Sequence, residues 1–268
     1  MKKALTPEHQ LYLRRRRRSK RFVIAMQICL LIAVFALWEL GGRLGWFDPF
    51  ILSGPVRVAQ TVARLYESGE LFLHIGTTLW ETVLGFLLGT ALGTLLAILL
   101  WWIPKLNEIL DPYLVVLNAL PKIALGPVLI VWIGAGMSSI VAMGILVSLV
   151  VTTVSVLNGF MTTTDDKQLL MRTLGANRWQ IFQKVVLPAS IPDLISALKI
   201  SVAMSWVGVI VGEYLVSKAG LGYLIVYGGQ VFKLDLVMAS VVLLCLLAAL
   251  MYYAIALLES FVQKHYRV

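Results

Sequence analysis

The polar residues of this sequence do not have the spacing of any common catalytic or metal site. Its three histidines, His9, His74 and His265, are far apart and cannot form a ligand cluster by spacing. There is no GxxxxGK[ST] segment to hold a nucleotide phosphate and no HExxH segment to bind zinc. The sequence therefore predicts no catalytic residue, no metal and no cofactor bound by this chain.

A few polar residues do occur inside long apolar stretches. Proline inside a membrane helix frees backbone carbonyls, and a lysine at that depth is costly unless it snorkels, pairs or faces an aqueous cavity. Such residues are candidates for lining a translocation path: Asn118, Pro121, Lys122, Pro127, Trp132, Ser205 and Glu213. The alternative is that Lys122 lies at the cytoplasmic interface and Glu213 at the external one.

Composition places these residues in a membrane protein. Hydrophobic residues make up 59% of the 268 residues and charged residues only 14%, against about a quarter in soluble domains. Residues 134–164 and 236–258 contain no charge at all. A helix needs about 20 such residues to cross ~30 Å of hydrocarbon. The fold class expected is an all-α membrane protein.

The apolar stretches predict six transmembrane helices, at residues 22–40, 77–101, 111–133, 140–160, 197–216 and 236–258. If both termini are cytoplasmic, the cytoplasmic segments hold 17 Lys and Arg residues and the external segments 5. This asymmetry follows the positive-inside rule and supports that orientation. We expect a basic cytoplasmic tail at 1–21, which is not expected to bind nucleic acid, and a six-span domain at 22–268.

Two shorter patterns concern packing. Gly85, Gly89 and Gly93 recur every four residues and would let two helix backbones approach closely. Packing within one subunit is favoured there, and a subunit interface or sliding face is the alternative. Outside the membrane, Ser53 is expected to cap a short helix that begins near Pro55. Its apolar face, formed by Val58, Val62 and Leu65, either lies in the interface or packs on the chain's own spans.

Residues 163–195 form a polar segment between predicted spans 4 and 5. The segment starts polar, breaks at Gly175, resumes as an amphipathic run over 178–187 and stops at Pro188. A helix–turn–helix with an apolar face outside the membrane predicts a docking element for a soluble partner.

The same segment carries a family resemblance. Gly175, then nine residues, then Val185-Val186-Leu187-Pro188 resembles the cytoplasmic loop of binding-protein-dependent ABC transporter permeases. Residues 174–182 are similar to the nitrate/sulfonate/taurine branch, and 121–136, 212–214 and 220–223 agree with it. The resemblance implies a multi-pass permease of the bacterial plasma (inner) membrane that forms a dimer, with homodimerisation expected. It also implies two cytoplasmic ATPase subunits, which would bind ATP and Mg²⁺, and an extracytoplasmic substrate-binding protein.

The resemblance also assigns roles in the loop. The residues expected to couple to the ATPase are Gly175, Ala176, Asn177, Arg178, Trp179, Ile181, Phe182, Leu187 and Pro188. One departure is that Leu169 stands where the family usually has a glutamate. We therefore expect docking to depend more on burial of Trp179, Ile181 and Phe182.

The substrate is less constrained than the class of protein. The resemblance implies a small solute of the nitrate, sulfonate or taurine kind, and Lys122 favours an anion. A stand-alone secondary transporter or channel is the alternative function, and a membrane scaffold is a third that would leave Lys122 unexplained. Enzyme activity of this chain itself is not expected.

Overall fold

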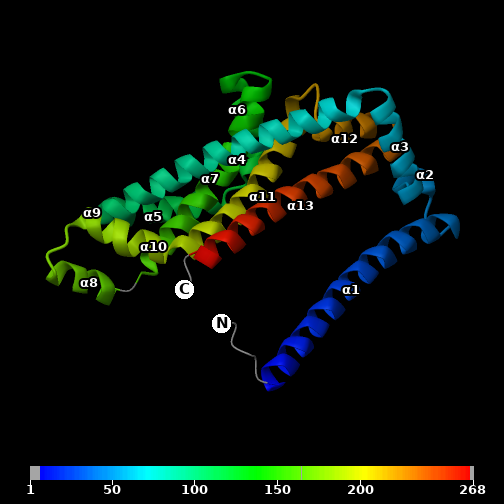
Figure 1. Cartoon of the computed structure of the whole chain (residues 1–268). Coiled ribbons are helices and arrows are strands. Elements are labelled where there is room, and N and C mark those ends of the chain that lie inside the picture. Colours follow the sequence, from blue (N-terminus) through cyan, green and yellow to red (C-terminus); the bar gives the residue numbers. More distant parts are fainter. Residues whose placement is uncertain (1–6, 164, 266–268) are drawn as a thin grey trace.

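A computed structural model describes residues 7–163 and 165–265 of the chain (Figure 1). Every regular element within these residues is a helix. Five helices are long and apolar enough to cross a membrane: α1 (Pro7–Arg43), α4 (Glu70–Trp102), α7 (Met137–Met161), α11 (Ile191–Val216) and α13 (Leu234–His265). The expectation of an all-α protein with apolar spans is confirmed. The ends differ: α4 and α11 begin at Glu70 and Ile191, several residues before the predicted starts.

The third predicted span, at residues 111–133, is sharply bent. It consists of α5 (Pro104–Ala119), η1 (Lys122–Leu125) and α6 (Gly126–Ile133), and the two halves meet at 88°. Leu120 is extended, with a ψ of 135°, because a proline at the next position disfavours helical geometry in the residue before it. Pro121, one of the prolines that the sequence places in this span, stands at the bend.

Helix α7 lies between α4 and α11, and glycines of all three helices meet at Gly144. A methyl group added to Gly85 on α4 would lie 3.3 Å from the Gly144 Cα atom. One added to Gly208 on α11 would lie 2.8 Å from that atom and 2.6 Å from the Met143 carbonyl oxygen. Gly89 and Gly93 face α7 farther along α4, against Ser148 and Leu149. The predicted glycine stripe therefore lies between helices of one chain.

Helix α1 stands apart from the other spans (Figure 1). None of its apolar window, within Arg21–Arg43, is buried, and its helix neighbours are α2 (Pro49–Leu52) and α3 (Pro55–Glu67). The helix runs unbroken from Pro7, so the predicted boundary at residue 21 is not a break in secondary structure. Residues 1–6 of the predicted tail lie outside the described residues.

Helix α3 is attached to the start of α13. Ser53 is not the predicted cap, because Gly54 takes that position and the Ser53 Oγ atom donates a hydrogen bond to Asp235 Oδ1 at 2.7 Å. The Arg57 guanidinium pairs with the same carboxylate at 2.8 Å. Val58 and Leu65 are buried, so α3 packs on the chain's own helices. The remaining helices are α8 (Asp165–Thr173), α9 (Arg178–Ile181), η2 (Phe182–Val186), α10 (Leu187–Ala189) and α12 (Leu221–Gln230).

Candidate functional site

The segment between α7 and α11 is built around a turn at Gly175. This glycine has a φ of +79°, a left-handed conformation that side chains rarely adopt. The turn is closed by the Ala176 N–H, which donates to the Met171 carbonyl at 2.9 Å. Helix α8 therefore ends in a glycine-dependent turn that reverses the chain into α9.

Asn177 fixes the start of α9. Its side-chain oxygen accepts a hydrogen bond from the Gln180 N–H at 2.9 Å, and the Gln180 side chain accepts one from the Asn177 N–H at the same distance. This reciprocal arrangement is a capping box, which satisfies two backbone donors that a helix start leaves unpaired.

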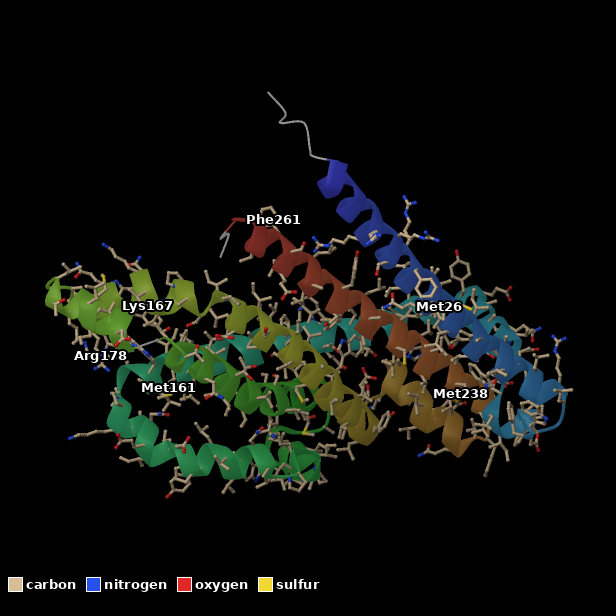
Figure 2. The ribbon with its side chains drawn as sticks, turned by 90° about the horizontal axis from the view of Figure 1, so that it is seen from below. Met26, Met161, Lys167, Arg178, Met238 and Phe261 are labelled. Atoms are coloured by element: carbon tan, nitrogen blue, oxygen red, sulfur yellow. The ribbon has the colours of Figure 1, made fainter. Side chains whose placement is uncertain are left out.

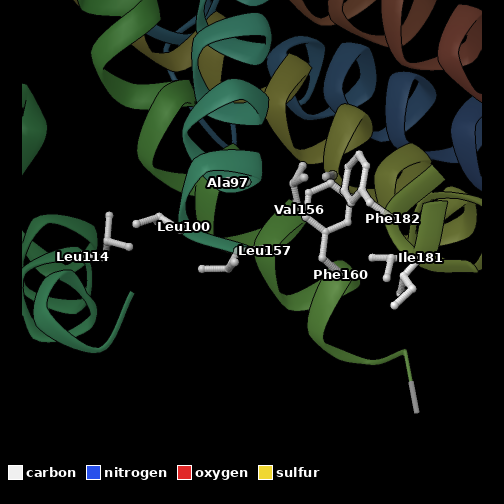
Figure 3. Packing of buried hydrophobic residues seen from close by; sticks show 10 residues of the cluster. Ala97, Leu100, Leu114, Val156, Leu157, Phe160, Ile181 and Phe182 are labelled. Atoms are coloured by element: carbon white, nitrogen blue, oxygen red, sulfur yellow. The ribbon is translucent and has the colours of Figure 1, made fainter. Parts of the chain in front are cut away.

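An aromatic cluster attaches α9 to the ends of α4 and α7. The Phe182 ring lies 4.9 Å from Trp101 and 5.5 Å from Phe160, measured between ring centroids. The Arg178 guanidinium carbon lies 5.6 Å from the centre of the Trp101 ring and 5.7 Å from that of Trp102. Figure 3 shows Phe182 packed beside Phe160 and Val156, with Ile181 nearby.

This packing corrects one prediction. Ile181 and Phe182 were expected to bury against a partner, but they are 3% and 4% exposed because they fill the core of their own chain. Trp179 remains 56% exposed, although its ring stacks on one side against Phe182. Of the three residues proposed for apolar docking, only Trp179 presents surface to a partner.

Further apolar side chains are exposed beside Trp179. Leu169, in place of the family's usual glutamate, is 60% exposed, Leu170 is 61% and Leu174 is 74%. We call these four residues the apolar tip. Figure 2 places the neighbouring Lys167 and Arg178 together at this end of the molecule. The tip combines exposed apolar surface with a turn and a helix start that are both fixed by hydrogen bonds.

The chain leaves the tip through a widened turn. Residues Phe182–Val186 form a π-helix, in which the Leu187 N–H reaches back to the Phe182 carbonyl. Pro188 follows directly, and proline has no N–H and crowds the carbonyl four residues earlier. The extra residue per turn therefore accommodates Pro188 without breaking the path from α9 into α11.

Two of the candidate path residues meet at the bend of the broken span. The Lys122 ammonium donates a hydrogen bond to the Asn118 carbonyl at 3.0 Å, and Lys122 is half-buried. Asn118 also lines a cavity of about 300 Å³ between α5 and α7, together with Asp111 and Asn158. Pro121 stands at the bend, Pro127 lies in the first turn of α6, and Trp132 is 78% exposed near its end.

The other two path candidates are placed differently. Ser205 is fully buried and Glu213 is 1% exposed, because both face the helices that pack against α11. Neither lines an open surface in this structure. Within the described residues, no ion pair joins Lys122 to Glu213.

Instead, Glu213 holds the start of α12. Its Oε2 atom accepts a hydrogen bond from the Gly222 N–H at 2.6 Å. The preceding donors go to α4: the Leu221 N–H donates to Thr78 Oγ1 at 2.8 Å, and the Gly220 N–H donates to His74 Nδ1 at 3.0 Å. Side chains of α4 and α11 therefore satisfy the backbone donors at the first turn of α12.

A second buried acid, Glu81 on α4, completes this cluster. It is 2% exposed, and its carboxyl group lies close to that of Glu213. The Glu81 Oε2 and Glu213 Oε1 atoms are buried and have no hydrogen-bond partner. No cation within the described residues pairs with either group. We therefore expect the two carboxyls to share one proton, which would satisfy both oxygens.

The cluster was missed in the sequence, although part of its signal was visible. His74, Thr78 and Glu81 have the i, i+4, i+7 spacing of one helix face. The sequence analysis considers Glu213 only as a path-lining or external-interface residue, because nothing in the sequence links it to Glu81 or Gly222. A methyl group on Gly222 would lie 2.8 Å from the Glu213 Oε2 atom, so this glycine admits the carboxylate.

Comparison with known proteins identifies the family. Residues 75–267 match the description "Binding-protein-dependent transport system inner membrane component". The chain belongs to this family of ABC transporter permeases. The predicted family and its multi-pass inner-membrane location are therefore confirmed. The matched region begins close to the start of α4, so α1–α3 lie outside it.

Individual permeases agree with this assignment. The chain is 32% identical to a probable ABC transporter permease of Haemophilus influenzae, over 82% of this chain and 89% of that protein. It is 30% identical to the putative aliphatic sulfonates transport permease SsuC of Bacillus subtilis, over 90% and 87%. The inward-facing methionine ABC transporter MetNI shares the fold, with a TM-score of 0.61 and 22% identity over 68% of this chain and 91% of that one.

Proposed function

We propose that this permease is the membrane subunit of an ATP-driven importer for a small anionic solute of the nitrate, sulfonate or taurine kind. An extracytoplasmic binding protein delivers the solute, and two cytoplasmic ATPase subunits drive a dimer of this chain. Family membership supports the general scheme. The observation that carries the coupling role is the apolar tip, which is exposed beside a turn and a helix start that are both fixed by hydrogen bonds.

The ATPase docks on the apolar tip in this proposal. Leu169 offers no ion pair, but an exposed ion pair contributes only about 0–1 kcal/mol. Burial of apolar area contributes about 25 cal/mol per Å², so one buried Trp179 side chain is worth a few kcal/mol. Apolar contact at Trp179, Leu170 and Leu174 therefore replaces the polar contact that the family's glutamate would make.

Replacing Trp179 with alanine should reduce co-purification of the ATPase by about tenfold or more, because a loss of 1.4 kcal/mol is tenfold in affinity. Its thermal unfolding midpoint should stay near that of the wild type, since Trp179 is 56% exposed. The measurement is the ATPase-to-permease ratio after affinity purification of the complex. Trp46→Ala is the matched control, because Trp46 is 69% exposed near the far end of α1.

Phe182→Ala separates docking from folding. Phe182 is a core residue, so its loss should lower the unfolding midpoint, as large-to-small core changes of an aromatic cost about 3–5 kcal/mol. If Trp179→Ala leaves both ATPase co-purification and substrate-stimulated ATP hydrolysis intact, the apolar tip is not the docking surface.

The path is proposed to run along the bend at Asn118–Lys122. Lys122→Ala should lower the uptake rate of the complex while leaving its assembly intact. The change removes a charge at the bend but no side chain of the buried core. Uptake in proteoliposomes, compared with ATPase co-purification, measures the two effects separately. Lys105→Ala, an exposed lysine at the start of α5, serves as the control. Equal uptake by Lys122→Ala and the wild type would remove Lys122 from the path.

A stand-alone secondary transporter or channel would carry solute without ATP. Ser205 and Glu213 are sealed inside the helix packing of the single chain, so a path between the spans of one subunit gains no support from them. The exposed faces of α5 and α6, with Val131 at 82% and Trp132 at 78%, are instead proposed to pack against a second copy. Solute flux through this chain alone in liposomes would favour the alternative.

A further inference from the structure

A second and larger cavity lies at the opposite end of the bundle from the apolar tip. It has a volume of about 790 Å³ and lies between α3, the start of α4, α12 and the start of α13. Figure 1 shows these elements gathered at the end away from α8 and α9. No described residue of the segment 163–195, or of the bend at Asn118–Lys122, lines this cavity.

The charge of its lining is positive. Arg57, Arg64, Lys218 and Lys233 line it, against the acids Glu70 and Asp235. Asp235 is already paired with Arg57, and the Arg64 guanidinium donates to Thr61 Oγ1 at 2.8 Å. Among the described residues, neither Lys218 nor Lys233 forms an ion pair. Two lysines and one arginine therefore remain available to an anion.

One wall of the cavity is an ordered aromatic ladder. His74 stacks on Tyr223 at 6.1 Å between ring centroids, and Tyr223 stacks on Tyr227 at 5.9 Å. Because His74 Nδ1 accepts the hydrogen bond from Gly220, its neutral ring carries the proton on Nε2. The wall is fixed by the same contacts that hold the start of α12.

The rim of the cavity is apolar and exposed. Phe50 is 51% exposed, Leu73 is 58% and Phe232 is 71%, and all three line the cavity. A ligand that fits this lining has a negatively charged head for the lysines and Arg64, and a hydrocarbon portion for the rim. Lipid headgroups with acyl chains and soluble alkyl anions share this chemistry.

We propose that the cavity between α3, α12 and α13 is a binding site for an amphiphilic anion, with its phosphate or sulfonate held by Arg64, Lys218 and Lys233 and its hydrocarbon part against Phe50, Leu73 and Phe232. The site does not depend on the transport role proposed above. It follows from unpaired cations and exposed apolar side chains around one cavity.

Native mass spectrometry of the purified full chain tests the lipid source, with phosphatidylglycerol and phosphatidylcholine as probes. Hexanesulfonate, followed by calorimetric titration, tests the soluble source. The variant is Arg64→Ala combined with Lys233→Ala. Each basic residue near a lipid headgroup is worth about fivefold in affinity, so the double change should weaken anion binding about 25-fold. The charge-conserving pair Arg64→Lys and Lys233→Arg should retain most of it.

The matched control removes the same charge elsewhere, with Arg43→Ala and Lys105→Ala. Selective loss of phosphatidylglycerol in the cavity variant supports the site with a lipid as the source, and selective loss of hexanesulfonate supports it with a soluble anion. Absence of both preferences in the wild type overturns the proposal. Equal losses in the control and cavity variants overturn it as well, because binding would then follow net charge.

Discussion

Gly208→Ala is expected to destabilise the permease by about 1–3 kcal/mol, the usual cost of forcing an extra methyl into a packed core. The new methyl would lie 2.6 Å from the Met143 carbonyl oxygen and 2.8 Å from the Gly144 Cα atom. Both are backbone atoms of α7, so no side-chain rotation relieves the contact and the two helices must separate. The thermal unfolding midpoint in detergent measures the loss, and Gly208→Leu should abolish the monodisperse species.

Gly76→Ala is the matched control, since Gly76 lies within α4 with no heavy atom within 4 Å of an added methyl. Alanine favours helix over glycine, so this variant should be as stable as the wild type or slightly more so. A midpoint for Gly208→Ala equal to that of Gly76→Ala would show that α7 and α11 are not in contact at Gly144.

Glu213→Ala should be the most damaging single change at the end of the bundle that lies away from the apolar tip. It removes the acceptor of the Gly222 N–H and leaves Glu81 buried without its partner. Leaving a buried polar group without its hydrogen-bond partner costs about 1–3 kcal/mol for each group. The expected result is a large fall in the unfolding midpoint together with loss of uptake.

Glu213→Gln tests the shared proton. Its amide oxygen can still accept from Gly222, and its NH₂ group can donate to Glu81 as a protonated carboxyl would. We expect its stability to stay within about 1 kcal/mol of the wild type, the net value of one typical hydrogen bond. A Glu213→Gln variant as unstable as Glu213→Ala would mean that the two carboxyls do not share a proton.

Much of the architecture could be predicted from the sequence because a membrane imposes few choices. An apolar run of about 20 residues must be helical, since only a helix satisfies its own backbone in hydrocarbon. The bend at Pro121 follows from the backbone restriction that proline imposes on the residue before it. The close packing at Gly89 and Gly93 follows from the absence of a side chain on glycine. Helix ends were less predictable, because polar residues such as Glu70 continue a helix beyond the hydrocarbon.

The sites were harder to predict because they depend on which other helices, or which partner, each helix face packs against. The apolar residues of 178–187 could have faced either a partner or their own chain. The sequence does not show that Phe182 is buried in its own chain whereas Trp179 is exposed. The environment of Glu213 depends on Glu81 and Gly222, which lie on two other helices. Hydrogen bonds between residues such as Thr78 and Leu221, 143 positions apart, leave no periodic signal.

Helix α4 connects the end of the bundle that carries the apolar tip to the end that carries the start of α12. Its 33 residues form one unbroken helix, about 50 Å long at 1.5 Å per residue. At one end, Trp101 and Trp102 contact Arg178 and Phe182. At the other end, His74 and Thr78 accept hydrogen bonds from the backbone N–H groups at the start of α12. If the ATPase docks on the apolar tip as proposed, a single continuous helix therefore links its docking surface to the backbone of α12.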